Sequence, residues 1–439
     1  MNKNLSIILL FFFIINCSFD KTTGIWTEDI KIEKEKKNKE KKSKIEKVFK
    51  KEKFFIKEFN PDLRINLSAK LVNNSFINNF DNNNGRINYD GNLKKKSKFK
   101  FSKIVNFNRF EPEISFYKDN VIFFDNKGSI LKFNEKSKLV WKKNNYTKVE
   151  KKLKPILFFA NDQNNLIVAD NIAKYYSINI NTGELLWSKN ASSPFNSEIK
   201  IFKDKFFIID FDNTLRCFSI KDGNQIWKVK TEQSFIKSDK KLSLVIVDNI
   251  VYFINSIGDV TAVDIKNGEI IWQTPTQSSL IIEDTFYLKN SELIANNNSI
   301  LFSNNRNDFF SLDSKTGIIN WKQKINSDLR PTLIDNLVFT VTSEGFLVII
   351  DNLSGNIIRS TDIFNIFKEK KRNKIKPVGF IVGSQKIFLT TDHGRLIIIN
   401  ITDGKALSIL KIDNDKISRP FILNQNLFII KENSIIKLD

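Results

Sequence analysis

"NGEIIWQTP", at positions 267–275, is one of four similar phrases in which a glycine is followed four residues later by a tryptophan. The other three are "NTGELLWSKN" (181–190), "KDGNQIWKVK" (221–230) and "KTGIINWKQK" (315–324). A fifth copy, "KSKLVW" (136–141), keeps the tryptophan but has Ser137 in the glycine position. Repetition at a regular interval is the sequence mark of a repeat architecture, so the interval decides the fold class.

The interval between copies matches one blade of a β-propeller. The tryptophans are spaced 46, 40, 45 and 49 residues apart, and they are Trp141, Trp187, Trp227, Trp272 and Trp321. Upstream of each lies a strand, a turn and a second strand, as in "DNIVYFINSIGDVTAVD" (248–264). Eight such cores begin near residues 119, 165, 205, 249, 299, 336, 385 and 426. Four-stranded blades repeat at about 40–45 residues, so residues 97–439 are predicted to form an all-β, eight-bladed propeller of four-stranded antiparallel blades.

Each blade in such a ring depends on its neighbours. The glycine allows a backbone turn with positive φ before the outermost strand, and the tryptophan ring on that strand can pack against the next blade. The eighth core ends at Asp439 without an outermost strand, so an earlier segment must supply one. "SKFKFSKIV" (97–105) is the predicted closing strand, and "RINLS" (64–68) is the alternative.

The N-terminal residues predict export and a lipid anchor. The apolar run Leu5–Ile15 is too short to span a bilayer, which indicates a signal peptide over residues 1–16. "IINC" ends at Cys17 and resembles a lipoprotein signal, which implies acylation of that cysteine; an ordinary signal peptide with an incidental cysteine is the alternative. Residues 17–96 are rich in Lys and Asn and are predicted to be a largely disordered tether.

The charge of +21 does not by itself indicate nucleic-acid binding. The chain has 60 Lys but only 10 Arg, whereas nucleic-acid surfaces favour Arg, whose planar fork contacts phosphate and guanine through two bonds. Lys, Asn, Ile and Phe all have AT-rich codons, so a compositional bias of the genome explains the excess more simply. We therefore predict no nucleic-acid partner.

Residues able to carry catalysis are scarce. The single histidine, His393, lies in a turn, and Cys217 lies in a strand as a small apolar residue. Asp264 and Asp313 adjoin turns and are interpreted as turn formers rather than ligands. No phosphate-binding glycine loop is present. The sequence predicts no enzyme activity, no metal and no cofactor.

Together, the repeats and the lipoprotein signal resemble the BamB family of outer-membrane protein assembly factors, whose repeat is of the quinoprotein type. The resemblance implies a non-enzymatic scaffold lipoprotein, a monomeric propeller within the β-barrel assembly machinery, on the periplasmic face of the outer membrane and docked to the central barrel protein. Blades six and seven depart from the repeat, with Arg359 and Ser408 in the tryptophan position. A periplasmic propeller that binds another partner or a cell-wall polymer is one alternative, and a quinoprotein dehydrogenase is the other.

The resemblance also implies two contact loops. The loop between blades three and four corresponds to "TEQSFIKSDKKLS" (231–243), where Phe235, Ile236 and Lys237 are the candidate contacts. The loop between blades four and five carries Glu283 and Asp284 as a second, acidic candidate. Apolar residues in an otherwise polar loop often mark a recognition site.

Overall fold

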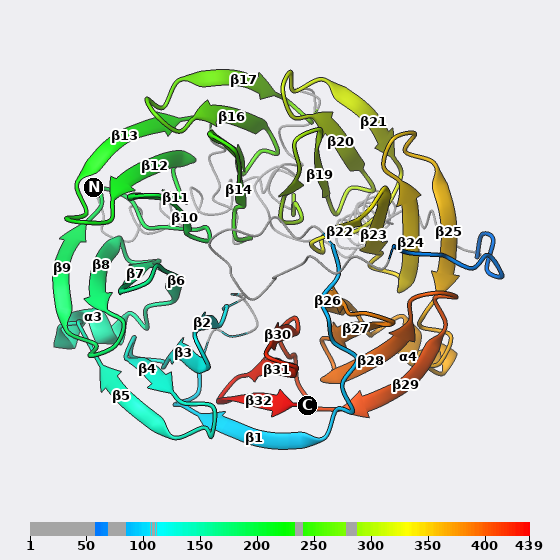
Figure 1. Cartoon of the computed structure of the whole chain (residues 1–439), viewed down its shortest axis with the longest axis horizontal. Helices are drawn as coiled ribbons and strands as arrows, with labels where there is room; N and C mark the ends of the chain where they lie inside the picture. Colours follow the sequence, from blue (N-terminus) through cyan, green and yellow to red (C-terminus); the bar gives the residue numbers. More distant parts are fainter. Residues whose placement is uncertain are drawn as a thin grey trace, which may run out of the picture. The chain divides into compact units, whose positions relative to one another are not determined.

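Eight four-stranded antiparallel sheets form a closed ring around a central channel in the computed structural model of this chain (Figure 1). The structure describes residues 58–68, 85–105, 107, 110, 112–232, 240–277 and 288–439. The predicted fold class and number of blades are confirmed. Within the described residues, none of the helices has the length and apolar character needed to cross a membrane.

The blades follow one another along the chain, with the innermost strand first. The strands of blades 1 to 4 are β2 (Ser115–Tyr117), β3 (Asn120–Phe124), β4 (Ile130–Phe133) and β5 (Leu139–Lys143); β6 (Leu157–Asn161), β7 (Asn165–Asp170), β8 (Lys174–Asn179) and β9 (Leu185–Asn190); β10 (Lys200–Phe202), β11 (Lys205–Ile209), β12 (Thr214–Ser219) and β13 (Gln225–Lys230); and β14 (Leu244–Val247), β15 (Ile250–Ile254), β16 (Val260–Asp264) and β17 (Ile270–Thr274).

Blades 5 to 8 repeat this plan, except that the outermost strand of blade 8 comes from the N-terminal side. Their strands are β18 (Ile294–Ala295), β19 (Ser299–Ser303), β20 (Phe309–Asp313) and β21 (Ile319–Gln323); β22 (Thr332–Ile334), β23 (Leu337–Val341), β24 (Phe346–Asp351) and β25 (Ile357–Asp362); β26 (Pro377–Val382), β27 (Lys386–Thr391), β28 (Arg395–Asn400) and β29 (Ala406–Lys411); and β30 (Phe421–Leu423), β31 (Asn426–Lys431), β32 (Ser434–Leu438) and β1 (Lys95–Lys100). Two short helices, α3 (Lys148–Lys152) and α4 (Glu369–Arg372), lie in the links between blades.

The ring is closed by strand β1, which pairs antiparallel with β32, with Phe99 opposite Ile435 and Lys100 opposite Ser434. The segment predicted to close the ring is therefore confirmed, although the strand covers residues 95–100 instead of 97–105. The alternative, residues 64–68, lies elsewhere, because the amide of Ile65 donates to the carbonyl of Thr402 in blade 7.

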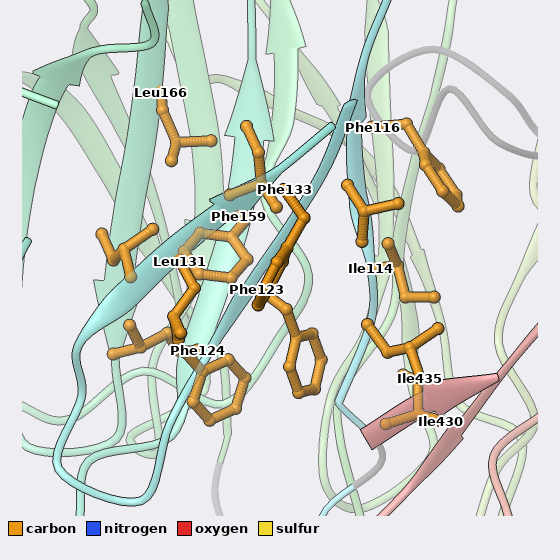
Figure 2. Packing of buried hydrophobic residues seen from close by; sticks show 14 of the residues in the cluster. Ile114, Phe116, Phe123, Phe124, Leu131, Phe133, Phe159, Leu166, Ile430 and Ile435 are labelled. Atoms are coloured by element: carbon orange, nitrogen blue, oxygen red, sulfur yellow. The ribbon is translucent and has the colours of Figure 1, made fainter. Parts of the chain in front are cut away.

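The core is a series of apolar layers between neighbouring blades. Figure 2 shows Phe123 and Phe133 of blade 1 among side chains from both adjacent blades, such as Phe159 of blade 2 and Ile435 of blade 8. The strands β3, β7, β11 and their equivalents are almost wholly buried, because they have a neighbouring blade on each side. This arrangement explains why they read as near-continuous apolar runs in the sequence.

The antiparallel order gives the ring two different faces. The turns between first and second strands and between third and fourth strands lie on one face, which we call the hairpin face. The turns between second and third strands, and the links from each blade to the next, lie on the other, which we call the linking face. The predicted contact loops, 231–243 and the loop between blades four and five, are links of this second kind.

Residues N-terminal to the predicted boundary at 97 also belong to the folded unit. Ile65 is 7 % exposed within a buried cluster from blades 6 and 7, and Tyr89 is fully buried between blades 7 and 8. Residues 58–68 and 85–94 therefore pack on the propeller, whereas the sequence had placed them in the tether. Because the neighbouring sequence is of low complexity, it did not indicate that a few apolar side chains of these residues are buried between blades. Residues 17–57 and 69–84 of that tether, and the signal peptide, lie outside the described part of the chain.

The glycine and tryptophan of the repeat act across blade junctions. The indole Nε1 of Trp187 donates to the carbonyl of Ile220 in blade 3, at 3.0 Å, and the ring lies under Gly223 of the same blade. A Cβ built on Gly223 would be 2.5 Å from that ring. Blade junctions 3/4, 4/5 and 5/6 are alike, with Nε1 of Trp227, Trp272 and Trp321 donating to the carbonyls of Ile265, Ser314 and Asn352.

Blade 1 forms the same junction with a different donor. Trp141 lies beneath Gly183, with a Cβ on that glycine 3.1 Å from the ring. The equivalent carbonyl, that of Ile180, accepts instead from the ammonium of Lys132 at 3.0 Å. The glycine is therefore needed for close approach to the preceding blade as well as for its positive φ, which is 68° at Gly223.

This double requirement predicts that Gly223→Ala destabilises the ring more than Gly258→Ala. Both glycines have positive φ, 68° at Gly223 and 93° at Gly258, so an alanine would strain the backbone at either position. A Cβ at Gly258 would meet its nearest atom at 3.1 Å, against 2.5 Å at Gly223. Overpacking of that kind costs about 1–3 kcal/mol. Urea unfolding of the two variants measures the difference, and equal midpoints would show that the ring contact with Trp187 is unimportant.

Candidate functional site

Charged residues gather in the central channel at the linking face. In five blades the residue two positions before the innermost strand is charged; these residues are Glu113, Glu198, Glu292, Arg330 and Arg419. Innermost strands line the channel, so the same position in different blades is brought to the same level around the axis. Lys200 at the start of β10 and Lys241 before β14 complete the set, which we call the channel cluster.

Lys241 links opposite sides of this cluster. Its Nζ lies 2.6 Å from a carboxylate oxygen of Glu113 in blade 1 and 3.2 Å from one of Glu292 in blade 5. Glu113 also accepts from Arg419 at 3.1 Å, and Glu292 lies 3.5 Å from Nε of Arg330. One lysine of blade 4 thus holds together carboxylates that come from two other blades.

A second, smaller group lies beside it. Lys200 Nζ is 3.5 Å from Glu198, and the hydroxyl of Ser243 donates to the same carboxylate at 3.4 Å. The hydroxyl of Ser243 also accepts from the amide of Leu293, at 2.9 Å. Side chains of the channel cluster expose only 1 to 18 % of their surface, so these charges interact with little screening by water.

Burial and charge act in opposite directions on the cluster's pKa values. Burial alone would raise the pKa of Glu292, but Lys241, Arg419 and Arg330 more than offset it and hold that pKa well below its usual value. The pKa of Glu113 is lowered for the same reason, against its burial, by Lys241 and Arg419. Burial lowers the pKa of Lys241, but Glu113 and Glu292 raise it to a net value above normal. All three groups are therefore charged at neutral pH.

The cavities described beside the cluster are small. Within the described part of the chain, two cavities of about 20 and 30 Å³ adjoin it, with Glu292 and Arg419 lining both. Each holds about one water molecule, whereas pockets for drug-sized ligands measure roughly 300–1,000 Å³. Among the described residues, no group of three or more His, Cys, Asp or Glu side chains is placed to hold a metal ion.

The residues considered for chemistry have structural roles. Asp264 accepts from the amide of Lys266 at 2.7 Å, and Asp313 accepts from the amide of Thr316 at 2.8 Å, so both are turn formers as predicted. His393 is exposed on a turn, with Nδ1 2.8 Å from Asp392. Cys217 is fully buried, and burial raises the pKa of its thiol to about 12, which makes it unreactive.

The predicted partner contacts lie outside the described residues. This applies to Phe235, Ile236 and Lys237 in the first loop, to Glu283 and Asp284 in the second, and to the lipidation candidate Cys17. The ends of the first loop are described: the carbonyl of Glu232 accepts from Asn213 at 2.7 Å, and Lys240 lines the larger cavity beside Glu292 and Arg330. Both described ends therefore lie on the linking face, and the Lys240 end adjoins the channel cluster.

The channel cluster itself was missed by sequence reasoning. A glutamate or arginine two residues before the innermost strand in five of the blades is the available sign, and in blades 6 and 8 a proline follows the arginine at once, as in Arg330–Pro331 and Arg419–Pro420. This pattern can be recognised only after the blades are aligned by the hydrogen-bond register of their strands, because the register shows which residues occupy the same position.

These features define a class: an eight-bladed β-propeller in which glycine–tryptophan contacts join five pairs of neighbouring blades and buried ion pairs lie at the channel. The sequence profile of the family described as "Outer membrane protein assembly factor BamB" matches residues 126–361, which is more than half of the chain. The chain belongs to that family. No curated protein sequence matches it significantly.

Solved structures with the same fold come from several functional classes. BamB from Moraxella catarrhalis superposes with a TM-score of 0.66 at 14% identity, covering 79% of this chain and 99% of that one. A computationally designed protein, Ika8, gives a TM-score of 0.59 at 13% identity, covering 77% and 99%. The quinohemoprotein alcohol dehydrogenase from Comamonas testosteroni gives 0.60 at 10% identity, covering 81% and 78%. At these identities the likeness establishes the fold alone.

Proposed function

We propose that this chain is a non-enzymatic scaffold lipoprotein of the β-barrel assembly machinery, which helps outer-membrane proteins to assemble by docking to the central barrel protein. The observation that carries the proposal is the family match across residues 126–361, since that family is described as an outer-membrane protein assembly factor. The ion pairs of the channel cluster, with two described cavities beside them the size of a water molecule, agree with a platform better than with an enzyme.

The proposal includes an anchor and a tether. Cys17 follows a short apolar run and carries two acyl chains, which hold a protein at a membrane far more firmly than one chain does. The Lys-rich residues after it connect the lipid to the propeller. The protein then resides on the periplasmic face of the outer membrane, as one propeller within a larger complex.

Docking is assigned to the linking face. Phe235 and Ile236 are apolar residues beside the charge of Lys237, and apolar anchors ringed by charge are the composition of interface hot spots. The described ends of their loop, Glu232 and Lys240, belong to this face. Glu283 and Asp284, in the next link around the ring, provide a second contact of opposite charge.

The test is co-purification from detergent-extracted membranes. Phe235→Ala combined with Lys237→Glu is expected to weaken association with the central barrel protein by about tenfold or more, since loss of a hot-spot residue costs about 1–2 kcal/mol or more. The melting temperature is expected to stay nearly unchanged, because the loop adds little to the ring.

The matched control is Lys370→Glu, a charge reversal at an exposed residue of helix α4. An equal loss with this variant would show that overall charge, not the loop, drives association. Full co-purification of the double variant would refute the loop assignment. Absence of any component of the assembly machinery from the wild-type preparation would refute the proposed function.

A further inference from the structure

The junction between blades 6 and 7 replaces the repeated tryptophan with Arg359. This residue pairs with Ile349 of β24, and the register shifts directly afterwards, between Ile349 and Ile350. The tryptophans have the same register, as where Trp187 pairs with Ser177 before a shift at Ile178. Arg359 therefore occupies the tryptophan position in structure as well as in sequence.

Arg359 also takes over the tryptophan's hydrogen bond, and it makes more. Its Nη2 donates to the carbonyl of Ile401 at 3.3 Å, three residues before Gly404, where the indoles donate at their own junctions. Its Nη1 donates to the carbonyls of Thr402 and Leu63, the latter at 2.8 Å. An indole has one N–H donor and a guanidinium has five, so the arginine can bind a second backbone segment that a tryptophan could not.

That second segment is residues 58–68 of the same chain, which lies beside β25 in Figure 1. Phe59 and Ser360 exchange two backbone hydrogen bonds, of 3.0 and 2.9 Å, as in an antiparallel sheet. The amide of Asp362 donates to Glu58 at 2.9 Å, and the side chain of Asn60 donates to the carbonyl of Ile358 at 3.2 Å.

The segment continues inward across the hairpin face. The amide of Ile65 donates to the carbonyl of Thr402 at 2.9 Å, and its side chain is buried in the cluster of blades 6 and 7. At the inner end, the amide and hydroxyl of Ser68 both donate to the carboxylate of Asp335, at 3.0 and 2.8 Å. Blade 6 thus binds both ends of the segment, and blade 7 binds its middle.

We propose that the hairpin face at the junction of blades 6 and 7 is a binding site for an extended peptide, occupied in this protein by its own residues 58–68. Arg359 and the edge of β25 recognise the peptide backbone. The apolar cluster selects a branched aliphatic side chain at the position of Ile65, and Asp335 selects a hydroxyl three residues later. The bound peptide joins the two blades where the tryptophan contact is missing.

The first experiment empties the site in the full chain by replacing residues 58–68 with a Gly-Ser segment of the same length. Hydrogen exchange of amides that do not bond to the segment, in β29 and at Gly404, is expected to accelerate about tenfold or more, which corresponds to the loss of about 1.4 kcal/mol of local stability. Exchange in β13, on the far side of the ring, is expected to stay the same. Unchanged exchange in β29 and at Gly404 would overturn the proposal.

The second experiment refills the site. A synthetic peptide with the sequence of residues 58–68, added to the Gly-Ser variant, is expected to restore protection in β29. The same peptide with Ile65→Asp and Ser68→Ala is expected to leave the exchange fast. If the unmodified peptide restores nothing, or if both peptides act alike, the site has no peptide selectivity and the proposal fails.

A pair of point variants in the full chain covers the case in which the replacement prevents folding. Ile65→Asp is expected to accelerate exchange in β29, whereas Asn66→Asp, an exposed neighbour given the same new residue, is expected to behave as the wild type. Equal exchange in the two variants would overturn the proposal.

Discussion

Replacing Phe99 with aspartate is expected to open the ring and to make the protein aggregate. Phe99 is fully buried on the closing strand β1, with its ring centroid 5.6 Å from that of Phe133 in blade 1 and 6.1 Å from that of Phe428 in blade 8. Loss of a buried aromatic ring costs about 3–5 kcal/mol, and a carboxylate in its place adds the cost of a buried charge. Without β1, the edge of β32 becomes a free template for pairing with other molecules.

Thermal unfolding and size-exclusion chromatography measure both effects. Lys100→Asp is the control, since it places the same residue on the same strand at an exposed position. The Phe99 variant is expected to melt far lower than the control and to elute partly as aggregate. Two monomeric variants that melt within a few degrees of each other would contradict it.

Replacing Lys241 with methionine is expected to be the most damaging single change in the channel. The ammonium is the shared partner of Glu113 and Glu292, and methionine would leave both carboxylates buried with part of their charge compensation removed. Removal of one partner from a buried ion pair typically costs about 3–5 kcal/mol, far more than loss of a surface pair. Lys221→Met, at an exposed position, is the matched control and is expected to melt as the wild type does.

The effect has a defined dependence on pH. The pKa values of Glu113 and Glu292 are lowered in the folded state, so their contribution to stability is present above about pH 4.3 and is lost as the pH falls through the folded-state values. The pKa of Lys241 is raised, so its contribution is present below about pH 10.4 and is lost only as the pH rises further. The cluster is therefore most stabilising between these limits.

In the methionine variant, both carboxyl groups are expected to have higher pKa values, because burial is then opposed by less positive charge. Their protonation in mild acid removes the unpaired charge. The difference in unfolding free energy between wild type and variant is therefore expected to be largest near pH 7 and to shrink toward pH 4. Chemical denaturation across that range measures it, and a difference that does not change with pH would contradict the assignment of the cost to the two glutamates.

Most of the fold was predictable because its causes are local and repeated. The Gly-x-x-x-Trp phrase and the paired strands upstream recur in register, so eight weak patterns support one another. The predicted cores begin within one residue of the second strands of their blades, as at 165 and β7 (Asn165–Asp170). The missing eighth outer strand pointed to an N-terminal closing segment, and alternating Phe99 and Phe101 indicated which one.

The channel cluster was beyond prediction because its members are far apart in sequence and come from different blades. Lys241 contacts Glu113 across a separation of 128 residues, and nothing near either residue indicates the other. A lone charge before a strand normally faces solvent. It becomes part of a buried network only because eight blades bring the same position to one axis.

The sequence by itself determined the repeat, the number of blades and the segment that closes the ring. These properties follow from side-chain period, turn chemistry and composition, which act over a few residues. Only the tertiary structure decided that glycine is needed to lie against the preceding tryptophan, that the charges of six blades meet in the channel, and that residues 58–68 bind where Arg359 stands in a tryptophan position. Each of these depends on closure of the ring, because closure sets which distant backbone groups and charges become neighbours away from water.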